Sequence, residues 1–230
     1  MKTIHSSIFR FLICLIAACL LQATPLLQGA SEEVTAPQYP ADALRHLTVA
    51  NCRDIVVAKG PVGRHYSLSH GFKTYAGLIH KYADPIGMDW CLLAAIIFQE
   101  SQYNEAAESS RSAKGLMQLR DVVAEQYGME DADLFDPETN LALGTRLFRD
   151  LIKGFQAEGL DSATVIKFAL ASYNSGGGTL AKRRLEAFDA GLDPDCWEDV
   201  AATYEKYSTI TPAYIEAVEE TYREYRQSVE

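Results

Sequence analysis

The segment MDWCLLAAIIFQES, residues 88–101, decides the fold of this 230-residue chain. Residues 92–98 are apolar without interruption, so a helix here has an apolar surface on nearly every side. Such a helix is stable at the centre of a domain, where neighbouring elements cover all of its faces. The segment then ends on three polar residues, 99–101, the second of which is Glu100. We therefore predict a buried central helix that carries a carboxylate at its C-terminal end.

The sequence around this segment also has a helical pattern. Apolar residues recur at helical spacing over residues 71–84, and Asp136 followed by Pro137 is typical of a helix start. Gly144 lies on the apolar stripe of that second helix and predicts close contact with a neighbour. Residues 162–174 predict another apolar helix that ends at the glycines 176–178, and residues 211–212 predict the start of a last one. No segment alternates with a period of two for long, so the predicted fold class is predominantly α.

The N-terminal segment has the features of an export signal. Lys2 and Arg10 precede the apolar run FLICLIAACLL, which is too short to span a bilayer, and small residues follow at 29–30. We read residues 1–30 as a signal peptide. A second reading is that IAAC, residues 16–19, resembles a bacterial lipobox, with Cys19 lipidated and the protein anchored to a membrane. The apolar residues that follow Cys19 count against this reading.

Either reading predicts an exported protein, located in the periplasm or cell envelope. Residues 31–65 form a lead-in segment interrupted by prolines and glycines, with a short helix at 41–49, and residues 66–230 form the functional domain. Cys91 is expected in the core, and Cys52 with Cys196 is the disulfide pair to test.

The composition excludes some partners and gives no sign of others. The formal net charge is −10 and no basic cluster stands out, which argues against nucleic acid as a partner. No cysteine or histidine spacing fits a zinc site, and we predict neither a metal nor a cofactor.

Glu100 has the setting of a catalytic acid. It closes an apolar helix, so burial should raise the pKa of its carboxyl, and the partial negative charge of the helix end acts in the same direction. A carboxylic acid that stays protonated near neutral pH can donate its proton to a leaving group such as a glycosidic oxygen. A single glutamate at a helix end is usually only a solvated terminus, so the neighbouring motifs decide between these readings.

Three motifs occur in a specific order and spacing. Glu100 is followed by serine, then come GLMQL at 115–119 and ASYNSG at 171–176. Together they resemble the catalytic domain of soluble lytic transglycosylases, which are relatives of goose-type lysozyme. Residues 133–152 and TPAYIEAV at 211–218 are similar to further segments of that family, so the resemblance covers about residues 69–225. It implies a lysozyme-like multi-helix domain with a substrate cleft.

The resemblance also implies an activity on glycan strands of peptidoglycan. Such enzymes cleave the β-1,4 bond between N-acetylmuramic acid (MurNAc) and N-acetylglucosamine (GlcNAc), and they leave a 1,6-anhydro-MurNAc end. Glu100 would act alone, first as acid and then as base. Two alternatives are a muramidase, in which water attacks instead, and an inactive peptidoglycan-binding module.

The resemblance assigns further site residues one at a time. Ser101 would orient the carboxyl group, and Met117 and Gln118 would line the groove as an apolar wall and a hydrogen-bonding group. The other expected substrate-binding residues are Ser109, Tyr173, Asn174 and Tyr214. Met117 as core filling and Asn174 as a helix cap are the alternatives from the residues alone.

Two further glutamates lie near Glu100, and some positions near the motifs differ from the family. Glu105 and Glu108 are expected to be surface charges. The chain departs from the family at several positions: Ser112 stands where a glycine is usual, and Ile210 stands where a glutamate is usual. Arg120 and Asp121 follow GLMQL where a proline is common, and ASYNSG replaces the commoner AAYNAG.

Overall fold

The computed structural model describes residues 70–229. The signal peptide, the lipobox at Cys19, the lead-in segment with its helix at 41–49, and Cys52 all lie outside these residues. The predictions about them, including the pairing of Cys52 with Cys196, therefore stay predictions.

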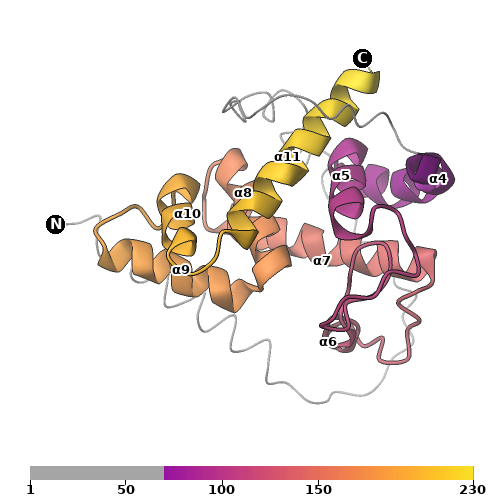
Figure 1. Cartoon of the computed structure of the whole chain (residues 1–230), viewed down its shortest axis with the longest axis horizontal. Helices are drawn as coiled ribbons and strands as arrows, with labels where there is room; N and C mark the ends of the chain where they lie inside the picture. Colours follow the sequence, from indigo (N-terminus) through magenta and orange to yellow (C-terminus); the bar gives the residue numbers. More distant parts are fainter. Residues whose placement is uncertain (1–69, 230) are drawn as a thin grey trace.

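The described part of the chain is almost entirely helical (Figure 1). Over residues 70–229 there is no strand, and pairing of β type is limited to the isolated bridges Glu108–Lys114 and Lys114–Leu119. This confirms the predicted α class. The helices are α4 (His70–Ala83), the short 3-10 helix η1 (Asp84–Ile86), α5 (Trp90–Ser101), α6 (Asp121–Gln126), α7 (Pro137–Ala157), α8 (Ser162–Ser175), α9 (Gly177–Asp189), α10 (Trp197–Glu205) and α11 (Ile210–Val229).

Helix α5 is the buried central helix that the sequence predicts. Its side chains from Cys91 to Ile97 are all buried, which confirms the expected core position of Cys91. The Asp89 side chain caps the helix by accepting a hydrogen bond from the Cys91 amide. Helix α4 packs on one side of α5, and α11 packs on another (Figure 1). The apolar segment is therefore covered on several faces, as its composition requires.

Hydrogen bonds connect α11 to α5 near both ends of α5. At the start of α5, the Tyr222 hydroxyl donates to the Asp89 carboxylate over 2.8 Å. At the other end, the Gln99 amide donates to the Thr221 hydroxyl over 2.8 Å. Because α11 also packs against α8 and α10, it joins the two ends of the molecule (Figure 1).

Helix α7 starts where the sequence predicts. The Asp136 side chain accepts a hydrogen bond from the Thr139 amide, and Pro137 is the first helical residue. The expected close contact at Gly144 is with Met117: a Cβ at Gly144 would lie 2.4 Å from the Met117 sulfur. Helix α7 packs on α8 and α4, so it underlies both the α5 end and the α8 end of the molecule.

Two predicted helix ends need correction. Helix α8 does end before the glycines, but only Gly176, at φ 86°, marks the break, and Gly177 and Gly178 belong to α9. The Gly176 carbonyl accepts hydrogen bonds from the amides of the third and fourth residues after it, which starts the new helix at once. The last helix begins at Ile210 rather than at residue 211, and the Ile210 amide donates to the Ser208 hydroxyl, two residues earlier.

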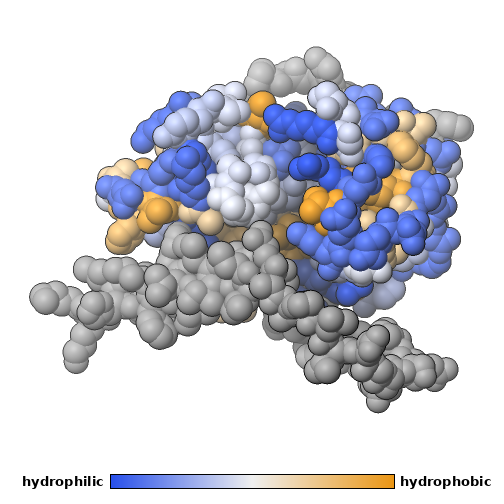
Figure 2. All heavy atoms as spheres, turned by 90° about the horizontal axis from the view of Figure 1, so that it is seen from below, coloured by the Kyte–Doolittle hydropathy of each residue, from blue (hydrophilic) through white to orange (hydrophobic). Residues whose placement is uncertain are grey.

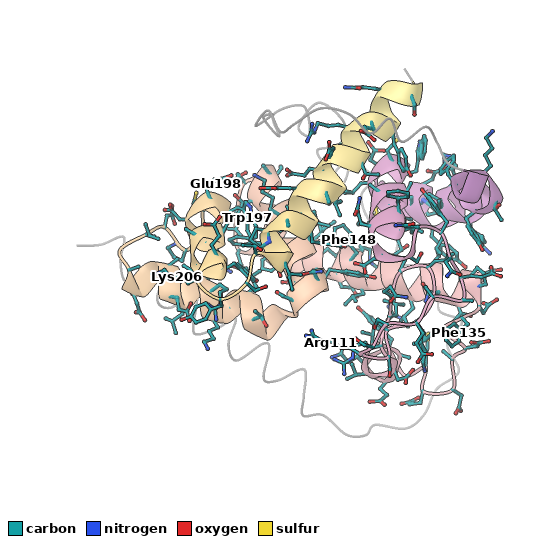
Figure 3. All side chains as sticks on the ribbon, in the orientation of Figure 1. Arg111, Phe135, Phe148, Trp197, Glu198 and Lys206 are labelled. Carbon is teal, nitrogen blue, oxygen red and sulfur yellow. The ribbon has the colours of Figure 1, made fainter. Side chains whose placement is uncertain are left out.

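Aromatic side chains of neighbouring helices pack against α8 at its middle and near its C-terminal end. Phe148, on α7, packs edge-on against Tyr173, and Trp197, on α10, packs edge-on against Phe168. Figure 3 labels Phe148 and Trp197. Hydrophilic residues cover much of the face shown in Figure 2, and hydrophobic residues form separate groups on it. No helix within residues 70–229 is long and apolar enough to cross a bilayer.

Candidate active site

Glu100 lies in the last turn of α5, partly buried, and the Tyr214 hydroxyl of α11 donates to its Oε1 over 2.7 Å. Burial raises the pKa of Glu100 from 4.5 to about 7, and the hydrogen bond from Tyr214 acts in the opposite direction. The dominant cause is burial, because a carboxylate loses hydration there. Both the protonated and the ionised form of Glu100 are therefore populated around neutral pH, which suits a group that must both give and take a proton.

The GLMQL motif forms a tight turn beside the end of α5. Lys114 and Leu119 exchange two backbone hydrogen bonds, of 2.8 and 3.0 Å, and so close the turn. Gly115 begins it at φ 74°, where a Cβ would lie 2.2 Å from the Leu134 carbonyl oxygen. Only glycine fits this position, for reasons of both backbone angle and space. The Ser101 hydroxyl donates to the Leu116 carbonyl over 2.8 Å and ties the turn to α5.

The side chain of Asn140, on α7, forms hydrogen bonds to the same turn. Its side chain is completely buried, and its Oδ1 accepts a hydrogen bond from the Met117 amide over 2.8 Å. Its Nδ2 donates to the carbonyls of Lys114 and Leu134, at 2.9 and 2.7 Å. Our sequence reasoning missed this residue. Its signal was an asparagine beside the apolar stripe of α7, since a buried amide needs dedicated partners.

Tyr173 completes the surroundings of Glu100. Its hydroxyl donates to the Met117 carbonyl over 2.6 Å, and burial together with the nearby Glu100 charge raises its pKa well above the usual value. Burial raises the pKa of Tyr214 well above its usual value, and the Glu100 charge and the hydrogen bond to Glu100 act in the same direction. Both phenols therefore stay protonated over any physiological pH. The structure brings Glu100, Tyr173 and Tyr214 together, and Tyr214 rather than Tyr173 holds the carboxyl group.

Asn174 connects the end of α8 to the start of α11. Its Oδ1 accepts a hydrogen bond from the Thr211 hydroxyl over 2.9 Å, and its side chain is exposed. Asn174 follows Tyr173 in the chain, and its partner Thr211 lies three residues before Tyr214. The contact fixes the α11 segment that carries Tyr214.

Met117, Gln118 and Ser101, which are also predicted site residues, make contacts within or beside the turn. The Met117 side chain is completely buried and lies against Gly144. The Gln118 amide nitrogen donates to the carbonyls of Ala107 and Gly115, at 3.1 and 3.0 Å, while the side chain is partly exposed. The Ser101 hydroxyl donates to backbone carbonyls, one of them that of Leu116, and not to the Glu100 carboxyl.

Ser109 and Ser112 shape the loop that precedes the turn. The Ser109 hydroxyl is exposed and accepts hydrogen bonds from the amides of Arg111 and Ala113, which stabilises the loop itself. Ser112 has φ 56°, a backbone conformation that glycine adopts more readily. Serine at this position therefore keeps the loop geometry at some cost in free energy.

The expected surface charges near Glu100 are exposed. Glu105 accepts a hydrogen bond from the Tyr75 hydroxyl over 2.5 Å, and Glu108 lies at the edge of the turn. Within residues 70–229, no group of three histidines, cysteines or acids is arranged to hold a metal ion. The Cys196 thiol, at the start of α10, donates to Glu198 over 3.3 Å.

Comparison with known proteins places this arrangement in a family. The chain is 37% identical over 156 residues to a protein named membrane-bound lytic murein transglycosylase F from Desulfosudis oleivorans; the match covers 68% of this chain and 33% of that protein. A protein of the same name from Marinobacter nauticus is 40% identical over 126 residues, covering 55% of this chain and 24% of that one. The chain thus spans a third or less of the length of these curated relatives.

A solved structure shares the fold. The lytic transglycosylase Slt of Pseudomonas aeruginosa, solved as an inactive mutant, matches with a TM-score of 0.51 and 20% sequence identity, over 71% of this chain and 25% of that one. This confirms the helical, lysozyme-like fold class. The model of the Transglycosylase SLT domain family matches residues 77–192, which include Glu100, the GLMQL turn, Tyr173 and Asn174. The chain belongs to the transglycosylase SLT domain family.

Proposed function

We propose that this domain is a peptidoglycan lytic transglycosylase that cleaves the β-1,4 bond between MurNAc and GlcNAc. The observation that carries the proposal is the state of Glu100: a carboxyl at the end of a buried helix, with a pKa of about 7, held by the Tyr214 hydroxyl. A group in this state can act as acid and as base within one reaction.

In the first step, protonated Glu100 donates its proton to the glycosidic oxygen, and the bond from that oxygen to C1 of MurNAc breaks. Tyr214 donates to Oε1, so the second carboxyl oxygen, Oε2, is the one that carries the proton. The 2-acetamido group of the substrate stabilises the positive charge that develops at C1.

In the second step, the Glu100 carboxylate accepts the proton of the C6 hydroxyl of the same sugar, and O6 forms a bond to C1. The product ends in 1,6-anhydro-MurNAc, no water is consumed, and Glu100 is protonated again. The hydrogen bond from Tyr214 stabilises the carboxylate between the two steps.

Neighbouring residues have separate tasks in this proposal. Gln118 and Asn174 offer polar groups to the sugar amides and hydroxyls, and Tyr173 lines the site beside Glu100. Ser101, Ser109 and Met117 hold the loop and the turn in place. Because the relatives are named membrane-bound murein transglycosylases, we also propose a location in the cell envelope. Lipidation at Cys19 is the proposed means of anchoring.

The test is mass spectrometry of purified peptidoglycan after digestion with the protein. Anhydro-muropeptides, each lighter than the hydrolysed product by one water, are expected from the wild type. Glu100→Gln should give none while it remains folded, because an amide cannot cycle a proton. Glu105→Gln, a matched change at an exposed neighbour, should keep the activity.

The other outcomes each point to a different function. Products with reducing ends would make the protein a muramidase. The absence of products from folded wild-type protein would favour a peptidoglycan-binding module. Full activity of a folded Glu100→Gln protein would remove Glu100 from the mechanism altogether.

A further inference from the structure

Two large apolar side chains project from the connection between α10 and α11. Tyr207 is 68% exposed and Ile210 is 70% exposed, which are the highest values among the large hydrophobic residues that the structure describes. We call this pair the rim platform. Exposed side chains of this size in one short connection are a candidate contact surface.

The Tyr207 ring is held in place. The guanidinium of Arg183, on α9, lies 4.0 Å from the ring centroid and covers one ring face. Arg183 is only 6% exposed and forms an ion pair of 2.7 Å with Glu186. The Tyr207 amide also donates to the Tyr204 carbonyl over 2.8 Å, so backbone and ring are both fixed. A fixed ring loses little conformational freedom when a ligand binds to its open side.

Helix α11 connects the rim platform to the residue that holds Glu100. Ile210 is the first residue of α11, and Tyr214, which holds Glu100, lies four residues later. Residues four apart lie on the same helix face, about 5–6 Å from each other. Thr211, between them, is bonded to Asn174 of the candidate site. Figure 1 shows the connection that leads into α11 from the α10 side.

The chemistry of the rim platform suits a sugar ring. One face of a pyranose presents C–H groups, which pack against an aromatic face whose quadrupole is negative. The residues around Tyr207, namely Lys206, Ser208 and Thr209, are all exposed and polar, as the hydroxyls of a sugar require. Two side chains among such neighbours are far too small for a protein interface, which buries about 800 Å² on each partner.

We propose that the rim platform binds a pyranose ring of the glycan strand next to the bond that is cleaved. This inference rests on the proposed function, and it adds a binding contact outside the group formed by Glu100, Tyr173 and Tyr214. It also includes Ile210, whose exposed apolar side chain follows Tyr207 by three residues in the chain.

The direct test uses the GlcNAc hexamer, a soluble β-1,4 glycan, and the Glu100→Gln protein, in which cleavage cannot interfere. We expect Tyr207→Ala to weaken hexamer binding about tenfold in calorimetry, since truncating a central aromatic contact has effects of this order. Tyr207→Phe should keep the affinity, because the ring rather than the hydroxyl makes the contact. Phe188→Ala, at a 44% exposed aromatic residue on α9, is the matched control and should have no effect.

A kinetic test with peptidoglycan separates this inference from the proposed function. In the otherwise wild-type protein, Tyr207→Ala and Ile210→Ser should raise KM several-fold and leave kcat unchanged. Unchanged hexamer affinity and KM in folded variants would overturn the rim platform while anhydro products still upheld the lyase. Hexamer binding that depends on Tyr207, without any products, would uphold the platform and reject the lyase. A dimer that Tyr207→Ala dissociates would assign the surface to self-contact and overturn the inference.

Discussion

Replacing Tyr214 by phenylalanine tests the acid directly, because it removes one hydrogen bond and little else. The Tyr214 hydroxyl lies 2.7 Å from Glu100 Oε1 and lowers the pKa of that carboxyl. A hydrogen bond to a charged group contributes about 1.5–3 kcal/mol. One pKa unit corresponds to about 1.4 kcal/mol, so the loss should raise the pKa of Glu100 by about one to two units.

The sign of the effect on activity follows from the form that reacts. Glu100 must be protonated to begin the reaction, so kcat/KM should fall as pH rises through its pKa of about 7. In Tyr214→Phe the carboxylate is less stabilised, so this fall should move to about pH 8–9. We also expect kcat near pH 6 to drop about tenfold, because the carboxyl group loses its fixed orientation.

The assay is the pH dependence of kcat/KM on peptidoglycan between pH 5 and 10. Tyr173→Phe is the matched control, because its hydroxyl donates to the Met117 carbonyl rather than to Glu100. In that variant, the pH at which kcat/KM falls should stay near the wild-type value. If the pH at which kcat/KM falls is unchanged or lower in Tyr214→Phe, this would refute the assignment of this hydrogen bond and of Glu100 as the titrating group.

Three further predictions concern stability. The folded-state pKa of Glu100, about 7, lies above its usual 4.5, so the stability that this raised pKa provides is complete below pH 4.5 and is lost as pH rises through 7. Urea unfolding at pH 8 should therefore show Glu100→Gln more stable than the wild type by at most about 3 kcal/mol. This difference should vanish at acid pH. Asn140→Ala removes three hydrogen bonds to backbone groups and should cost about 3 kcal/mol by the same measurement, against under about 1 kcal/mol for Asn104→Ala, where one exposed hydrogen bond is lost. Similar losses in both variants would contradict the role of Asn140. Ser112→Gly relieves a φ of 56° and should raise the melting temperature by a few degrees in calorimetry, and a decrease would show that the loop carries no strain.

The sequence predicted the elements that have a local physical cause. The all-apolar segment gave α5 and its burial, and the Asp136–Pro137 pair gave the start of α7, because capping and hydrophobic periodicity are written in a few neighbouring residues. The raised pKa of Glu100 followed from the same reasoning. The end of α8 was predicted, but the immediate restart at Gly177 was not, since three glycines resemble a loop in sequence.

The parts that escaped prediction depend on contacts between distant residues. Nothing near residue 214 shows that its hydroxyl reaches Glu100, and nothing near residue 117 shows that its side chain fills the space above Gly144. Asn140 holds a turn more than twenty residues earlier in the chain. Such pairings follow from how α7 and α11 pack, and helix packing is decided by the whole core.

The docking of α11 on α5 makes the order of synthesis matter. Glu100 is made early in the chain, while its partner Tyr214 belongs to the last helix that the structure describes. In a nascent chain that lacks α11, Glu100 has no hydrogen bond from Tyr214. The turn at residues 114–119 then lies beside an incomplete site. Glu100 therefore gains the hydrogen bond that orients its carboxyl group only when the final helix has folded into place.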